Sequence, residues 1–211
     1  DYYKWNDTYK LENLILEKLT GLGFTEIINN SISSLEETSD FYDTVKIINP
    51  IGKEFSNMRQ SLIYNSIEVI AYNLNRQNSR LKLFELGNIY GKHKKKYIEE
   101  KRLCISIVGE VFKSNWNIQK SPNSFFYGKG VIIDIFETFG YNNVKFSNVD
   151  HPEFDFACEI SSKSIAFGHY GLISVKTREK YSVEKEVREN YLRFNTYARD
   201  IVIARSSGDA G

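Results

Sequence analysis

The residues best suited to proton transfer or metal binding are three histidines, and their surroundings favour structural roles. His93 lies in a lysine-rich segment that we expect to be solvated, and His151 precedes a proline, which is typical of a turn. His169 lies inside an apolar run, where a packed or hydrogen-bonded ring is expected rather than a base. Because no spacing among these residues suits a metal, the sequence predicts no metal site.

The most basic segment of the chain is a cluster of four lysines, Lys92, Lys94, Lys95 and Lys96. One interpretation is a solvated loop whose charge is balanced by Glu99 and Glu100. The alternative is a contact with the phosphate backbone of RNA, which a salt dependence of binding would reveal. The net charge of the whole chain, +1, gives no general electrostatic reason to bind nucleic acid or a membrane.

Four further polar residues flank one predicted helix. Its apolar positions follow the 3.6-residue period, with Ser61 as a candidate N-cap, and are Leu62, Ile63, Ile67, Ile70, Ala71 and Leu74. Arg59 precedes this helix, and Asn73, Asn75 and Arg76 lie at its end. In one interpretation the arginine before the helix satisfies nearby carbonyl groups and the asparagines cap the helix. In the other, these residues contact another subunit, for which the planar guanidinium group is well suited.

The predicted elements alternate without a regular βαβ order. Helices are expected from Asp7 or Thr8 to Gly21 and at residues 61–74, 127–139 and 176–185. Strands are expected at residues 24–32, 45–48, 80–90, 103–108, 144–146, 156–160 and 164–169, with a tight turn between the last two. Because strands dominate the middle of the chain, we expect an α+β fold with a mainly antiparallel sheet rather than a doubly wound one.

Length and composition bound the class of protein further. A chain of 211 residues can bury one sizeable core. Cys104 and Cys158 lie in separate apolar runs without Cys-x-x-Cys spacing, so we expect buried free thiols, which fit a reducing cytoplasm. No stretch reaches the length of a membrane span. Because the sequence begins at Asp1 without a methionine, we expect it to be a piece of a longer protein.

Four motifs then occur in a fixed order. They are Asn49-Pro50, Met58-Arg59-Gln60-Ser61-Leu62, Asn73-Leu74-Asn75-Arg76 and Leu83-Phe84-Glu85-Leu86-Gly87. In this order and with compatible spacing they resemble the catalytic-like domain of the β subunit of bacterial phenylalanine–tRNA ligase. The resemblance covers roughly residues 11–185, which is most of the chain.

This resemblance implies a class II aminoacyl-tRNA synthetase-like architecture, a mainly antiparallel sheet flanked by helices, over residues 1–187. Residues 188–211 form a tail that is similar to the truncated start of the family's ferredoxin-like anticodon-binding domain. The similarity rests on residues 194–203, where the proline and first arginine of the family pattern are replaced. The usual linker is too short here, so we expect residues to be missing near 188–191.

The resemblance also allows the chemistry to be tested. Class II synthetases neutralise the phosphates of ATP with arginines on rigid strands and with magnesium. The strand that should carry one such arginine reads Phe84-Glu85-Leu86-Gly87, and the nearest arginine after Gly171 is Arg178. We therefore expect no catalytic residue, no metal and no cofactor in this fragment, with ATP and Mg²⁺ serving the whole enzyme.

The resemblance implies a non-catalytic, cytoplasmic scaffold that supports the α subunit, which attaches phenylalanine to tRNA(Phe), in an α2β2 assembly. The subunit-interface residues that it implies are Asn49, Pro50, Met58, Arg59, Asn73, Asn75 and Arg76. One alternative is a stand-alone tRNA-binding or RNA-binding module that uses the loop at residues 92–96. The other is a degenerate class II adenylating enzyme with altered motifs.

Overall fold

The computed structural model describes residues 7–33, 42–52, 55–94, 96–109, 124–180 and 197–202. The helices are α1 (Asp7–Gly21), α2 (Ile63–Leu74), α3 (Ser124–Thr138) and α4 (Val175–Lys180). The strands are β1 (Thr25–Glu26), β2 (Ile32–Ser33), β3 (Asn57–Met58), β4 (Leu81–His93), β5 (Lys96–Val108), β6 (Lys145–Val149), β7 (Phe154–Ser162), β8 (Ile165–Ile173) and β9 (Tyr197–Val202).

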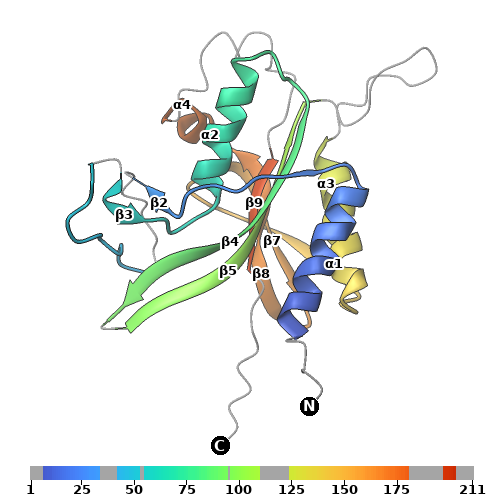
Figure 1. The fold of residues 1–211 in the computed structure, drawn as a ribbon. Helices are drawn as coiled ribbons and strands as arrows, with labels where there is room; N and C mark the ends of the chain where they lie inside the picture. The colour runs from blue at the N-terminus through green and yellow to red at the C-terminus, as the bar shows by residue number, and fades with distance from the viewer. Residues whose placement is uncertain are drawn as a thin grey trace, which may run out of the picture.

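Seven of these strands form one sheet in the order β1-β4-β5-β9-β8-β7-β6, and β2 pairs with β3 separately (Figure 1). Every pairing in the large sheet is antiparallel except that of β1 with β4. The longest hairpin joins β4 and β5, of 13 residues each, and its tip projects away from the helices. The predicted α+β fold with a mainly antiparallel sheet is confirmed.

Helices cover both faces of the sheet, with α1 and α3 on one side and α2 on the other (Figure 1). The larger core cluster joins Ile15 of α1 and Ile132 of α3 to sheet residues that include Phe84. A second cluster joins Ile67 of α2 to Ile173 of β8 and its neighbours. All six apolar positions predicted for the central helix are buried, as the 3.6-residue period requires.

Two of the strand predictions are wrong, both in the first third of the chain. The strand expected at residues 24–32 is reduced to β1 and β2, because the chain leaves the sheet edge after Ile27, whose N–H donates to Phe84 O at 2.8 Å. The strand expected at residues 45–48 is absent from the described elements, and a single antiparallel bridge joins Lys46 to Asn57 instead.

The other elements occur where they are expected, and several are longer. β5 begins at Lys96 rather than Leu103, and α4 covers residues 175–180, while residues 181–185 of the expected helix lie outside the described residues. Lys163 and Ser164 connect β7 to β8 with φ of 49° and 66°. Two successive left-handed residues are typical of the tight hairpin turn that was predicted there.

The tail contributes β9 to the large sheet. Its backbone pairs antiparallel with β5, from Arg102↔Val202 to Ile107↔Tyr197, and touches β8 at Gly168↔Ile201. Residues 188–191, near which missing residues were expected, lie outside the described ranges. The division at residues 187 and 188, with a ferredoxin-like tail, stays a prediction.

Candidate subunit interface

The predicted Asn49-Pro50 turn lies at the tip of a loop that we call the Asn49–Pro50 loop (residues 47–52, 55 and 56). A backbone bond closes the loop near its base, where Ile47 N–H donates to Ser56 O at 2.8 Å. Asn49 has φ of 58°, in the left-handed region that asparagine tolerates better than most residues. Both Asn49 and Pro50 are exposed, so the first two predicted interface residues lie at the surface.

The same loop exposes large apolar side chains that the sequence analysis did not single out. The exposed fractions are 88% for Ile48, 101% for Ile51 and 39% for Phe55. The sequence signal for this exposure was an isoleucine on each side of an Asn-Pro turn. A turn at the surface leaves its flanking residues little to pack against. The described residues of the loop thus expose three large apolar side chains close to Asn49 and Pro50.

Arg59, another predicted interface residue, lies inside the domain with 3% of its surface exposed. Its Nη1 atom donates to Glu85 Oε1 at 2.6 Å, and its Nε atom donates to Asn88 O at 2.9 Å. Glu85 is also 3% exposed, so the two side chains form a buried ion pair, the Arg59–Glu85 pair. Arg59 therefore bonds a carbonyl and a carboxylate within the domain, as the structural interpretation expects.

Further groups complete the surroundings of the Arg59–Glu85 pair. Asn29 Nδ2 donates to Glu85 Oε2 at 2.7 Å, which fastens the segment after β1 to β4. A β-carbon at Gly87 would overlap Arg59 Nη2, so the guanidinium occupies the space that a side chain would need. The Met-Arg and Phe-Glu-Leu-Gly motifs, which are separate in the sequence, are thus two halves of one buried contact.

The predicted interface residues after α2 mark the end of this helix. Asn75 is the C-cap, and Gln77 follows in the left-handed conformation with φ of 65°. The exposed Arg76 donates from Nη1 to Tyr72 O at 3.1 Å, and its guanidinium carbon lies 3.4 Å from the centre of the Tyr72 ring. Asn73 is half-buried and donates from Nδ2 to Val69 O at 2.8 Å.

The seven predicted interface residues therefore do not form one patch. The Asn49–Pro50 loop lies next to β3, to which Lys46 is joined through Asn57, whereas residues 73–76 lie at the C-terminal end of α2 (Figure 1). With a rise of 1.5 Å per residue, the 12 residues of α2 span about 18 Å, so residues 73–76 lie about that far from the start of the helix. Met58 is half-buried in β3. The role of the seven residues in subunit contact stays a prediction.

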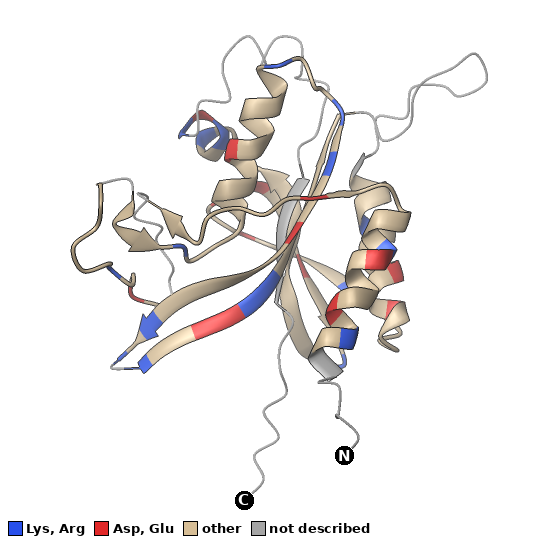
Figure 2. Cartoon of the chain, in the orientation of Figure 1, with Lys and Arg blue, Asp and Glu red and all other residues tan. Residues whose placement is uncertain are grey.

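The lysine cluster lies at the tip of the β4–β5 hairpin, seen in Figure 2 as positive charge at its far end. Lys92 is the penultimate residue of β4, Lys94 adopts φ of 57° in the turn, and Lys96 begins β5, while Lys95 lies outside the described residues. Lys92 is paired in register with Tyr97, which is 73% exposed, and its Nζ lies 5.8 Å from the ring centre.

The carboxylates expected to balance this cluster have partners in the hairpin and in the segment that contains Tyr42. Glu99 accepts a hydrogen bond from Asn88 Nδ2. Glu100 accepts from Tyr42 Oη at 2.8 Å and from Arg102 Nη2 at 2.9 Å. Burial and this bond to Glu100 raise the pKa of Tyr42, which keeps its hydroxyl protonated. Glu100 thus has a cationic partner in Arg102, whereas Glu99, bonded to a neutral amide, remains an anion three residues from Lys96.

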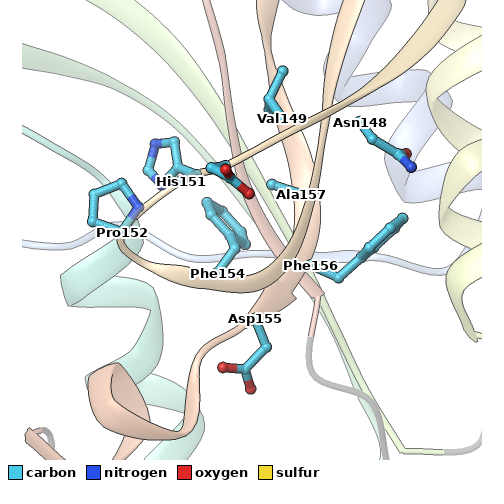
Figure 3. A pocket seen from close by; sticks show the side chains of 9 residues that line it. Asn148, Val149, His151, Pro152, Phe154, Asp155, Phe156 and Ala157 are labelled. Atoms are coloured by element: carbon cyan, nitrogen blue, oxygen red, sulfur yellow. The ribbon is translucent and has the colours of Figure 1, made fainter.

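A pocket of about 580 Å³ opens at the end of β6 (Figure 3). Its lining residues are Asn148, Val149, Asp150, His151, Pro152, Phe154, Asp155, Phe156 and Ala157. Asp155 is turned away from His151 and Phe154 and accepts a hydrogen bond from Val175 N, which begins α4. The ring of His151 lies 4.8 Å from that of His169, and Phe154 N–H closes a turn onto His151 O at 3.1 Å. Both histidines are half-buried with their rings in contact, and His151 also lines the pocket, so the structural roles expected for them stay predictions.

Thiols and metal ligands add no further site within the described ranges. Cys104 and Cys158 are buried free thiols, as predicted. No group of three or more His, Cys, Asp or Glu residues in the described part of the chain could hold a metal ion. No helix among those described is both long and apolar enough to cross a membrane.

Solved structures similar to this chain are aminoacyl-tRNA synthetases. Pyrrolysyl-tRNA synthetase from Desulfitobacterium hafniense superposes with a TM-score of 0.66 at 10% identity, over 92% of this chain and 65% of that one. A second structure of the pyrrolysyl enzyme from this organism gives a TM-score of 0.64 at 12% identity. At such low identity the likeness shows the fold alone, and it confirms the predicted synthetase-like architecture.

Sequence comparisons identify the family. The Phenylalanine–tRNA ligase beta subunits of Bacteroides fragilis and Bacteroides thetaiotaomicron are 28% and 30% identical to this chain, over 195 and 196 residues. Each match covers 84% of this chain and 24% of the relative, so the chain spans about a quarter of the length of these proteins. The family model described as the phenylalanyl tRNA synthetase beta chain CLM domain matches residues 3–188. The chain therefore belongs to the family of the phenylalanyl tRNA synthetase beta chain CLM domain.

Proposed function

We propose that the chain is a non-catalytic scaffold domain of a phenylalanine–tRNA ligase β subunit. In this proposal it supports an α subunit that attaches phenylalanine to tRNA(Phe) with ATP and Mg²⁺, within a cytoplasmic α2β2 enzyme. Membership of the family and the names of the curated relatives support the placement in the ligase. The geometry around β4 supports the non-catalytic role.

The main observation behind this proposal is that the guanidinium of Arg59 already bonds Glu85 inside the domain. An adenylating site must direct cationic side chains at the phosphates of ATP. Around residues 84–87, the guanidinium of Arg59 is instead directed at Glu85 and Asn88 O and is buried. The surrounding face of the sheet is filled by the apolar cluster beneath α2. The described residues around β4 therefore offer no free guanidinium to the phosphates of ATP, and no catalytic step is assigned to them.

Two measurements test this proposal. The purified chain, checked for folding by circular dichroism, should show neither ATP binding by calorimetry nor phenylalanine-dependent ATP–pyrophosphate exchange. It should co-purify with the α subunit of a phenylalanine–tRNA ligase when the two are co-expressed. Exchange activity of the chain alone would favour the degenerate adenylating enzyme, and failure to co-purify would refute the scaffold.

A second candidate function is an interaction between the lysine cluster and tRNA. The observation that favours it is the exposed Tyr97 beside Lys92 on a projecting hairpin, because aromatic rings stack on bases while lysines neutralise phosphates. Joint replacement of Lys92, Lys94 and Lys96 by glutamine should weaken tRNA binding. The slope of log K against log salt should fall by about one for each phosphate that a lysine no longer neutralises.

A matched control uses lysines on the opposite half of the sheet. Lys145 and Lys163 are exposed in β6 and in the β7–β8 turn, and their joint replacement by glutamine should leave the salt slope unchanged. Equal reductions of binding in the two sets would mean that net charge alone, and not the hairpin tip, attracts the RNA.

A further inference from the structure

The pocket at the end of β6 has no part in the proposed scaffold role, and its size suits a small molecule. Its volume of about 580 Å³ lies within the range of small-molecule sites, about 300–1,000 Å³. Val149 of β6 pairs with Ala157 of β7, and the bond from Phe154 N–H to His151 O closes the turn between these strands (Figure 3). The backbone around the pocket is therefore fixed by the fold, as in most small-molecule sites.

Aromatic rings form part of the pocket lining. Phe154 is buried and belongs to the core cluster beneath α2, and its ring centre lies 4.9 Å from that of His151. Phe156 is 42% exposed and packs against Phe125, with their ring centres 5.5 Å apart. Rings held in this way offer an apolar surface to a flat molecule, and the face of an aromatic ring attracts a cation.

The lining also carries negative charge. Asp150 and Asp155 both line the pocket, and no lining residue is a lysine or arginine. Asp155 Oδ2 lies 3.8 Å from Arg178 Nη2, whereas Asp150 forms no salt bridge with any residue that the structure describes. His151 adds no positive charge, because its Nδ1 accepts a hydrogen bond from Glu153 N–H at 3.3 Å and so carries no proton. The pocket thus combines an unpaired carboxylate with aromatic walls.

We propose that this pocket binds a small organic cation in which an amidinium or ammonium group is attached to an aromatic body. Asp150 pairs with the cationic group, and Phe154 and Phe156 contact the aromatic body. An exposed ion pair and a cation–π contact each strengthen binding by about threefold. A cation should therefore bind about tenfold more tightly than a neutral molecule of the same shape. This inference is independent of the scaffold role, so either one can fail without the other.

The test titrates the purified chain with benzamidine, benzamide and benzoate, which have nearly the same shape and are respectively cationic, neutral and anionic. Binding is followed by the chemical shifts of the backbone amides in NMR spectra. Benzamidine should saturate with a dissociation constant below about 10 mM, and the largest shifts should lie at residues 148–157. Benzamide should bind about tenfold more weakly and benzoate more weakly still.

Two variants test the carboxylate. Asp150→Asn should raise the dissociation constant of benzamidine about threefold and leave that of benzamide unchanged, since only the charge is removed. Glu137→Gln is the matched control: it removes the same charge from an exposed position of α3 that does not line the pocket, and it should change neither constant.

Each outcome decides between the assignments. Equal affinity for benzamidine and benzamide, or an unchanged benzamidine constant in Asp150→Asn, would overturn the assignment of a cation to this pocket. Equal weakening by Asp150→Asn and Glu137→Gln would mean that net charge alone attracts benzamidine, which also overturns it. A lack of saturation by about 10 mM, or shifts centred outside residues 148–157, would overturn the site itself.

Discussion

Replacing Gly87 by alanine should destabilise the domain by about 1–3 kcal/mol. The new β-carbon would overlap Arg59 Nη2 and lie 3.3 Å from Leu62 Cδ2, in a region where Arg59 is only 3% exposed. One way to relieve the overlap displaces the guanidinium and leaves Glu85 buried without its cation, which costs about 3–5 kcal/mol. The other shifts the backbone and neighbouring side chains, as in an overpacked core, and costs about 1–3 kcal/mol. Because the domain relaxes in the less costly of these two ways, the second range gives the expected destabilisation.

Urea unfolding of the chain, followed by circular dichroism, measures this destabilisation. Gly130→Ala is the control, because nothing lies within 4 Å of the added β-carbon. In the interior of α3 it should stabilise the domain by up to about 1 kcal/mol. In a background that already carries Arg59→Met, Gly87→Ala should be less destabilising, since the overlapping group is gone. A change smaller than about 0.5 kcal/mol for Gly87→Ala would refute the packing of Arg59 against this glycine.

The remaining predictions concern the buried pair, a partly desolvated carboxylate and a turn. Arg59→Met should lower the free energy of unfolding by about 3–5 kcal/mol, whereas Arg59→Met combined with Glu85→Leu should recover most of that stability. A double-mutant cycle measured by urea unfolding tests this, and additive effects of the two substitutions would contradict it. Glu68 is exposed, but partial desolvation of its carboxyl raises its pKa. The folded state therefore binds this proton more tightly than the unfolded state, so the stability that protonation contributes is present at low pH and is lost as pH rises through the folded pKa. Glu68→Gln should therefore raise the urea midpoint at pH 7 and leave it unchanged near pH 4, and an equal gain at both pH values would contradict the shift. Lys163→Asn with Ser164→Gly should stabilise the β7–β8 turn by about 1 kcal/mol, because both residues have positive φ, and a lower melting temperature would count against that turn geometry.

The sequence predicted elements well where burial and local periodicity coincide. The central helix is the clearest case, because its apolar residues recur every three or four positions and all of them are buried. The first half of β5 was missed, since residues 96–102 are mostly polar and lie in the projecting part of the hairpin. An apolar pattern cannot reveal a strand that buries neither face. Its partner β4, which starts under the helices, was located almost correctly.

The roles of charged residues could not be read from the sequence alone. Arginine is usually exposed, and the choice between a surface role and a buried pair for Arg59 depends on Glu85, which lies 26 residues later. Gly87 offered a usable signal, because a glycine within a strand often marks a place where another group approaches closely. The apolar pattern predicted a strand at residues 45–48, which includes Ile48, and only the fold shows that the side chains of Ile48 and Ile51 face solvent.

The Arg59–Glu85 pair also limits the routes by which this domain can evolve. A single substitution at either position leaves the other charge buried and unpaired, which lowers the free energy of unfolding by about 3–5 kcal/mol. Because an ordinary domain has only about 5–15 kcal/mol of stability, such an intermediate would lie close to unfolding. The two residues can therefore be exchanged for an apolar pair only together, or after other changes have first made the domain more stable. The pair would therefore persist in descendants because each single-substitution intermediate is unstable, even if an apolar replacement of both residues were equally stable.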